Sequence, residues 1–238
     1  MTAVEVKDLV KNFGDFQAVK GASFSVDEGE VFGLIGPNGA GKTTTMRMMS
    51  TLLEISGGSI NLFGYDVKEQ TDEVRRIISY LPEEAGAYKN LTGRQYLSFI
   101  GKFFAEGKEF EDILERGIKI ANLGERIDDK VETYSKGMTR RLLVGRALMF
   151  RPRLAILDEL TSGLDVINAQ KVRNTVKDTT KDGTTIIVSS HNMLEVELIC
   201  DRIALVNDGR VVEQGTPNEL KKKYDASNIE DVFVRVVG

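Results

Sequence analysis

The sequence has few of the features that mark secreted or membrane-spanning proteins. It contains one cysteine, Cys200, so no disulfide can form within the chain, and a small buried thiol is its expected role. The longest apolar stretches, at 31–35 and 154–157, fall far short of the roughly 18 residues that a membrane-spanning helix needs. The first residues lack the basic start and unbroken apolar segment of a signal peptide. These absences predict a cytoplasmic protein with no membrane-spanning segment.

The chain also lacks an excess of positive charge. Its formal net charge is -4 and its pI is about 5.3. A nucleic-acid-binding protein is expected to present a basic face that neutralises phosphates. DNA and RNA are therefore not expected partners. The composition, 41% hydrophobic and 29% charged, is ordinary for a globular protein that builds a sizeable core.

Short apolar runs alternate with helical patterns over most of the chain. Residues 31–35 read as a strand covered on both faces, 154–157 and 185–189 read as further strands, and helical periods separate them. This alternation predicts an α/β fold with a largely parallel sheet, preceded by an antiparallel edge in the first thirty residues. We expect one domain: an α/β nucleotide-binding core (1–82 and 151–215), an inserted helical subdomain (83–150) and a C-terminal tail (216–238), whose charge run at 221–223 is a solvated helix face.

A glycine-rich motif at residues 36–43 fits the pattern GxxxxGK[ST]. It lies after a buried strand and at the start of a helical pattern, which is the context that a phosphate-binding loop requires. Backbone amides of such a loop surround phosphates, the lysine bridges the β- and γ-phosphates, and the hydroxyl after it binds Mg²⁺. The predicted nucleotide-binding residues here are Gly36, Asn38, Gly39, Ala40, Gly41, Lys42, Thr43 and Thr44.

Two adjacent acids, Asp158 and Glu159, end the apolar strand at 154–157. Asp158 can meet the Mg²⁺ that Thr43 also binds, while Glu159 can orient and help deprotonate an attacking water. An apolar strand that ends in acids is common, so this pair alone has an equal chance of being structural. Together with the phosphate loop it predicts nucleotide hydrolysis.

A third motif carries a family resemblance. Residues 134–138, Tyr-Ser-Lys-Gly-Met, resemble the LSGGQ signature of ATP-binding subunits of ABC transporters, with Lys136 and Met138 as departures. Ser135 is also a good helix N-cap, so a simple cap is the alternative. The resemblance covers essentially the whole chain, and it implies that Ser135 and Gly137 bind the γ-phosphate held by another subunit.

Further motifs extend this resemblance. Residues 162–165 resemble the family's D-loop, and His191, the one histidine of the chain, stands where the family has a histidine that contacts the γ-phosphate. Phe13 stands where the family has an aromatic residue that stacks on adenine, with a core phenylalanine as the alternative. Glu83 stands where the Q-loop glutamine is usual and is assigned to the metal side. The resemblance thus implies Lys42, Glu159 and His191 as catalytic residues and Thr43, Asp158 and Glu83 as metal ligands.

The resemblance also implies partners and cofactors. Each ATP site of the family combines the phosphate loop of one subunit with the signature of another, so we expect a homodimer or heterodimer that uses ATP and Mg²⁺. The dimer would drive a separate membrane permease, contacted around residues 83–93, and would be held at the inner face of the membrane. Residues 228–233 resemble the tail of subunits of the sodium and multidrug export group, which favours export.

Other functions remain as alternatives. A soluble ABC-type ATPase that acts on ribosomes or DNA would usually carry two cassettes or a coiled-coil insertion and a basic surface. A P-loop kinase would not need the signature, the D-loop or the histidine, and a GTPase would want an Asn-Lys-x-Asp type motif. A non-catalytic scaffold is hard to reconcile with Lys42, Asp158 and Glu159.

Overall fold

The structure is a computed structural model that describes residues 1–238, apart from the side chains of residues 194 and 195. Strands and helices alternate from the third strand onward, as the sequence predicts. The strands are β1 (Thr2–Phe13), β2 (Phe16–Asp27), β3 (Val31–Ile35), β4 (Gly57–Leu62), β5 (Tyr65–Asp66), β6 (Ile78–Leu81), β7 (Leu154–Leu157), β8 (Thr185–Ser190), β9 (Arg202–Asn207) and β10 (Arg210–Gly215). The α-helices are α1 (Lys42–Met49), α2 (Thr71–Ile77), α3 (Gly93–Gly101), α4 (Gly107–Ala121), α5 (Lys136–Leu148), α6 (Val166–Lys181), α7 (Met193–Val196), α8 (Pro217–Lys223) and α9 (Ile229–Val237).

Two sheets form the core. The larger sheet has the order β10-β9-β3-β8-β7-β6, and every pair in it is parallel except β10 with β9. The smaller sheet, β2-β1-β4-β5, is antiparallel throughout. The predicted α/β fold with a parallel sheet and an antiparallel edge is confirmed.

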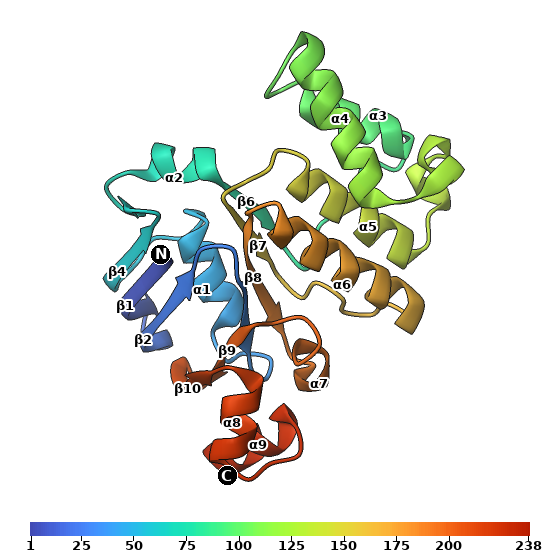
Figure 1. Ribbon diagram of the computed structural model, residues 1–238. Helices are drawn as coiled ribbons and strands as arrows, with labels where there is room; N and C mark the ends of the chain where they lie inside the picture. Colours follow the sequence, from blue (N-terminus) through green and yellow to red (C-terminus); the bar gives the residue numbers. More distant parts are fainter.

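The larger sheet is buried on both faces because its strands alternate between two hydrophobic clusters. In β3, Phe32 and Leu34 point to the cluster that contains α1 and the small sheet, while Val31 and Ile35 point to the cluster that contains α5 and α6. Helix α1 therefore lies between the two sheets, and α5 and α6 cover the opposite face (Figure 1). Burial on both faces explains why these strands read as unbroken apolar runs.

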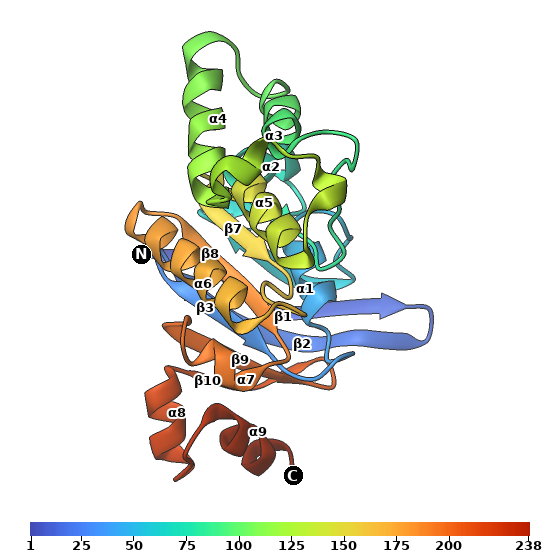
Figure 2. The ribbon, with the colours of Figure 1, turned by 90° about the vertical axis from the view of Figure 1, so that its right-hand side faces the viewer.

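Helices α3, α4 and α5 form a lobe beside the sheet, and Figure 2 shows α3 and α4 standing clear of it. The helix-like patterns at 92–106 and 193–200 predict helices over these residues. Helix α3 ends earlier, at Gly101, where an added Cβ would lie 3.1 Å from the Phe110 ring of α4. Helix α7 is a single turn within the second range.

The C-terminal residues form two helices that pack on the core. Leu220 of α8 and Ile229 and Val232 of α9 are buried in the cluster on the α5 and α6 side. The predicted helix face at residues 221–223 is present in α8, where Lys221 donates to Glu197 at 2.6 Å. Across the described residues, no helix is long and apolar enough to cross a bilayer.

Candidate functional site

The phosphate loop joins β3 to α1 in a conformation that only glycines permit at two places. Gly41 precedes the first residue of α1 with φ of 100°, and a Cβ there would lie 2.7 Å from the carbonyl oxygen of Ala18. A Cβ at Gly36 would overlap the carbonyl oxygen of Val206. In the described part of the chain no side chain caps the first turn of α1, so its amides are free to bind an anion.

Lys42 is the buried cation of this loop, with 6% of its side chain exposed. Its Nζ donates to the carbonyl oxygens of Gly36 at 2.7 Å and Pro37 at 3.1 Å, and it lies 3.9 Å from Oε1 of Glu159. Burial lowers the pKa of Lys42, while the negative charges of Glu159 and other nearby carboxylates oppose that shift. The ammonium is thus held inside the loop, next to the acids at the end of β7.

The two acids have different surroundings. Asp158 is almost fully buried and accepts hydrogen bonds from the hydroxyls of Ser189 and, at 3.4 Å, Tyr80. Glu159 has a left-handed backbone with φ of 47°, its amide donates to Ser189 Oγ at 2.9 Å, and its Oε2 lies 2.8 Å from Nδ1 of His191. One serine therefore contacts both residues of the pair, and the histidine contacts only Glu159.

A cavity of about 360 Å³ brings several predicted site residues together. Phe13 and Phe16 line it from the β1–β2 hairpin, and their side chains are 49% and 64% exposed. Glu83 and Glu159 line it from the ends of β6 and β7. The other lining residues are Ala18, Asn38, Gly39, Ala40, Gly41, Lys42, Thr43 and Thr44. The cavity thus combines an aromatic wall, a loop of amides, a buried lysine and two carboxylates.

Glu159 also lines a second cavity, of about 400 Å³, together with His191 and the D-loop residues Ser162 and Gly163. His191 is 48% exposed, so its ring reaches solvent while Nδ1 contacts Glu159. The carboxylate therefore lies between the phosphate loop on one side and the D-loop on the other.

The signature residues lie outside the phosphate-loop cavity. Ser135 caps α5 by accepting a hydrogen bond from the amide of Met138 at 3.2 Å. A Cβ at Gly137 would lie 2.7 Å from the side chain of Asn168 in the first turn of α6, so a larger residue there would require Asn168 to move. The Lys136 ammonium occupies the space that a side chain at Gly163 would need. Within the chain, this motif contacts α6 and the D-loop.

Three side chains that shape the site belong to none of the motifs in the sequence. Ser189 and Tyr80 bond the acids directly, and both are unremarkable polar residues near strand ends. Arg140, in the second turn of α5, donates to backbone carbonyls at the ends of β6 and β7. Only the position of Arg140 just after the signature could have drawn attention to it.

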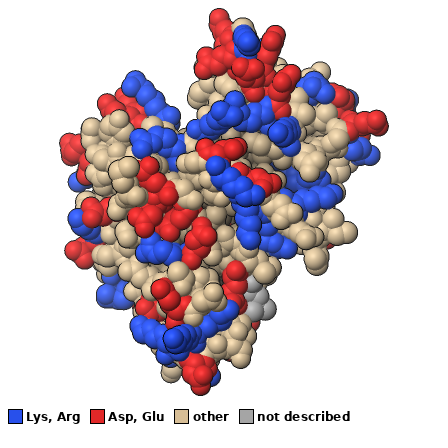
Figure 3. Space-filling view, viewed as in Figure 1, with Lys and Arg blue, Asp and Glu red and all other residues tan. Residues whose placement is uncertain are grey.

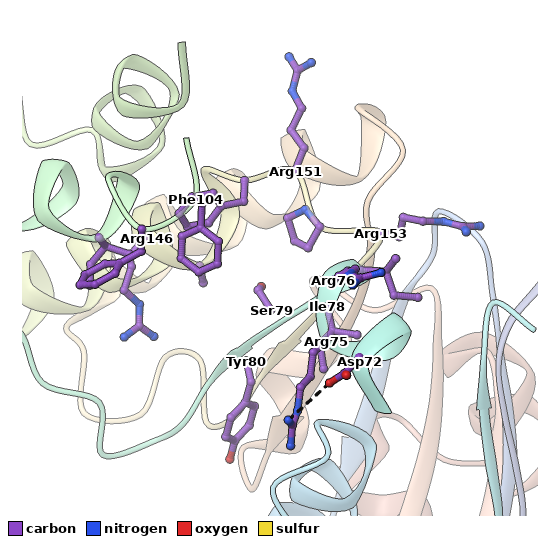
Figure 4. A pocket seen from close by; sticks show the side chains of 16 residues that line it. Asp72, Arg75, Arg76, Ile78, Ser79, Tyr80, Phe104, Arg146, Arg151 and Arg153 are labelled. Atoms are coloured by element: carbon purple, nitrogen blue, oxygen red, sulfur yellow. Dashed lines mark ion pairs between the residues drawn. The ribbon is translucent and has the colours of Figure 1, made fainter. Parts of the chain in front are cut away.

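A further cavity, of about 1040 Å³, lies between the core and the helical lobe. We call it the basic groove. In Figure 4, Phe104 and Arg146 approach it from the lobe, while Arg76 and Tyr80 approach it from α2 and β6. Basic side chains gather near this junction on the surface in Figure 3. Arginines outnumber the one lining acid, Asp72; they are Arg75, Arg76, Arg146, Arg151 and Arg153, and Phe103 and Phe150 add apolar surface.

Comparisons with known proteins agree with this geometry. The family model described as "ABC transporter" matches residues 19–162. The chain is 38% identical over 234 residues to the linearmycin resistance ATP-binding protein LnrL of Bacillus subtilis, covering 97% of this chain and 75% of that protein. It is 38% identical over 228 residues to the daunorubicin/doxorubicin resistance ATP-binding protein DrrA of Streptomyces peucetius, covering 94% and 68%.

A solved structure described as the ATP binding subunit of an ABC transporter superposes with a TM-score of 0.87 at 26% identity, covering 99% of this chain and all of that one. The match extends over the phosphate loop, the helical lobe and the C-terminal helices. The chain belongs to the ABC transporter family, as one of its ATP-binding and ATP-hydrolysing subunits.

Proposed function

We propose that the chain works as a dimer around two ATP molecules and powers a separate permease that exports its substrate. The observation that carries this proposal is the division of the predicted site. Lys42 and Glu159 share one cavity with Phe13, whereas Ser135 and Gly137 do not line it. A signature whose Ser135 and Gly137 lie outside the phosphate-loop cavity of their own chain supports a site completed by a second subunit.

Within one chain, each residue of the cavity has a role that its position supports. Phe13 offers a flat, half-exposed ring for adenine. The amides at residues 38–41, with the free first turn of α1 and the Lys42 ammonium, bind the phosphates. Glu159 accepts the proton of an attacking water, and His191, bonded to its other oxygen, holds the carboxylate in place and reaches the γ-phosphate.

The residues also fit Mg²⁺. This ion is usually bound through one or two carboxylates together with substrate phosphates, so a cage of many acids is not required. Asp158 is a buried carboxylate whose charge acts on the neighbouring Lys42, and Thr43 and Glu83 add oxygens from the wall of the cavity. Asp158, Thr43 and Glu83 would hold the ion, which neutralises charge on the transferring phosphoryl group when bound.

The permease contact that we propose is the surface at residues 83–93 together with the adjoining basic groove. Its arginines and exposed Phe103 and Phe104 complement a segment that carries acids beside apolar side chains. Such contact would hold the chain at the inner face of the membrane. The drug-resistance names of the two relatives above support export as the direction.

The hydrolytic proposal is tested by Glu159→Gln, with turnover and molecular mass measured in ATP and Mg²⁺. We expect turnover to fall by at least about 100-fold and an ATP-bound dimer to accumulate. Glu109→Gln, an exposed acid of α4, is the matched control and should change neither quantity. Unchanged turnover in Glu159→Gln would remove Glu159 from the mechanism, and a variant that stays monomeric with ATP would refute the shared site.

The permease proposal is tested by Arg76→Glu combined with Arg151→Glu. Both arginines are exposed, so the folded chain and its ATP turnover in solution should be retained. We expect the fraction of the chain that stays with washed membranes of the producing cells to fall severalfold, because the groove would repel an acidic partner. Lys222→Glu, exposed on α8 at the other end of the molecule, is the control. Membrane association that is equal in both variants would exclude the groove.

A further inference from the structure

Arg140 is a buried arginine whose guanidinium is surrounded by backbone carbonyl oxygens. Its side chain is 7% exposed. Its Nη2 donates to Asp158 at 2.6 Å and Glu159 at 3.0 Å, and its Nε donates to Leu160 at 3.0 Å. Its Nη1 donates to Pro82 at 3.1 Å and Glu83 at 3.3 Å. One side chain from α5 therefore bonds the main chain on two other segments.

The two segments follow adjacent strands. β6 and β7 pair in parallel, with Leu81 opposite Leu157, and the amide of Asp158 donates to the Leu81 carbonyl at 2.8 Å. Beyond this last bond the ladder ends, and the chain turns into the loops that carry Glu83 and Glu159. Arg140 continues the link between the two loops where the sheet no longer can.

The guanidinium suits this position because it is planar and carries five N–H donors in a fixed arrangement. It fixes the carbonyls on both sides of the left-handed Glu159, whose φ of 47° needs support from its surroundings. Burial lowers the pKa of Arg140 to about 10, and the negative charges of Asp158 and Glu83 oppose the shift, so the side chain stays protonated at neutral pH.

We propose that Arg140 is a positioning residue. It holds the loop that carries Glu159 and the loop that carries Glu83 in a fixed position relative to α5, the helix that begins in the signature. It lies about one helical turn beyond Ser135, so α5 joins the predicted phosphate contact of one ATP site to the loop that carries Glu159 for the other. Movement of the signature is thereby passed to Glu159 of the same chain. The roles of Glu159 and Glu83 in this proposal rest on the proposed function above.

The test compares Arg140→Met and Arg140→Lys with the wild type. In Arg140→Met we expect kcat to fall at least about tenfold, because the base is displaced from its working geometry. The Kd for ATP without Mg²⁺ should stay within about twofold, because the phosphate loop is untouched. Amide exchange should rise at residues 81–85 and 158–162 and not elsewhere. Arg140→Lys keeps the charge but not the planar fork, so it should recover only part of kcat.

Arg94→Lys is the control. Arg94 lies on α3 in an exposed ion pair with Asp128, so this variant should match the wild type. Unchanged kcat and exchange in Arg140→Met would overturn the proposal, and so would full recovery in Arg140→Lys, because charge alone would then suffice. If Arg140→Met does not fold, Arg140→Lys still decides between these outcomes. If the proposed hydrolysis is wrong, the wild type shows no turnover, yet the local change in amide exchange still tests the positioning role.

Discussion

Helices α1 and α5 begin in similar ways but in different surroundings. Each starts at a turn that contains glycine and leaves amides at its N-terminus. The turn before α1 has a buried lysine beside it and faces the carboxylate of Glu159. The turn before α5 has a serine cap and contacts α6 and the D-loop of its own chain.

An anion site needs more than the free backbone amides that any helix N-terminus offers. A free helix N-terminus attracts phosphate by itself only weakly, and a specific site adds a cation and groups that act on the bound phosphate. At α1 the Lys42 ammonium and the Glu159 carboxylate line the same cavity as the loop amides. At α5 the Lys136 ammonium lies against Gly163, and neither Ser135 nor Gly137 lines the cavity that Lys136 shares with Glu159. If α5 binds phosphate, the remaining groups must come from a second subunit.

The largest expected effect is on the α1 side. Lys42→Met removes the buried cation, which contributes to stabilising the charge of the transferring phosphoryl group, so ATP turnover should fall by at least about 100-fold. Steady-state turnover at saturating ATP measures this. Turnover within a factor of two of the wild type would mean that the Lys42 cation does not distinguish the α1 site from the α5 site in ATP hydrolysis.

A mixing experiment tests whether the two helix starts belong to one shared site. Lys42→Met and Ser135→Arg should each be inactive alone. An equal mixture that exchanges subunits should recover about a quarter of wild-type turnover, because half of the dimers are mixed and one of their two sites is intact, if the sites act independently. Each variant assayed alone at the same total concentration sets the background, and Ser135→Arg mixed equally with wild type should by the same arithmetic keep about half of wild-type turnover. Absence of recovery would contradict independent shared sites.

A smaller effect is expected at the aromatic wall of the α1 cavity. Phe13→Ala should weaken ATP binding by about tenfold, since stacking of a base on an aromatic ring is worth about 1–3 kcal/mol. Phe16→Ala is the matched comparison, because Phe16 lines the same cavity and is more exposed. Binding of a fluorescent ATP analogue measures both. A larger loss of affinity in Phe16→Ala than in Phe13→Ala would assign adenine stacking to the Phe16 ring instead.

The smallest effect concerns the pH dependence of the α1 site. The charge of Glu83 raises the pKa of Lys42, against the lowering by burial. Glu83→Gln removes that contribution, so the Lys42 pKa falls further and the ammonium is lost at lower pH. The alkaline limb of kcat/KM, which reports the free enzyme, should move to lower pH by less than about one unit. A shift to higher pH would show that Glu83 does not act on Lys42.

The sequence predicts the fold where local and tertiary signals agree. The limits of β7 match the predicted strand at 154–157, because its apolar run lies between Arg153 and Asp158. Helix α2 and strand β10 were not predicted. The start of α8 does carry a signal, since Thr216 and Glu219 form a capping box and Pro217 is the first helical residue.

The candidate site is predictable only in part, for a different reason. Motifs identify residues that would contact ATP, such as Lys42, but not the side chains that support them. Arg140 donates to carbonyls whose sequence separation from it runs from 18 to 58 residues, and a carbonyl carries no signature in the sequence. Which carbonyls it reaches depends on how α5 packs beside β6 and β7.

The left-handed backbone of Glu159 also bears on how this protein responds to selection for heat resistance. A glutamate in that conformation costs on the order of 1 kcal/mol relative to glycine. Its side chain is only 6% exposed, and its carboxylate pairs with Lys42 and with His191. Glu159→Gly would relieve that cost, but it would also leave the buried Lys42 without this carboxylate, and breaking a buried ion pair costs about 3–5 kcal/mol. A screen for heat resistance would therefore not enrich glycine at this position, because the carboxylate that serves as the proposed base also contributes to stability.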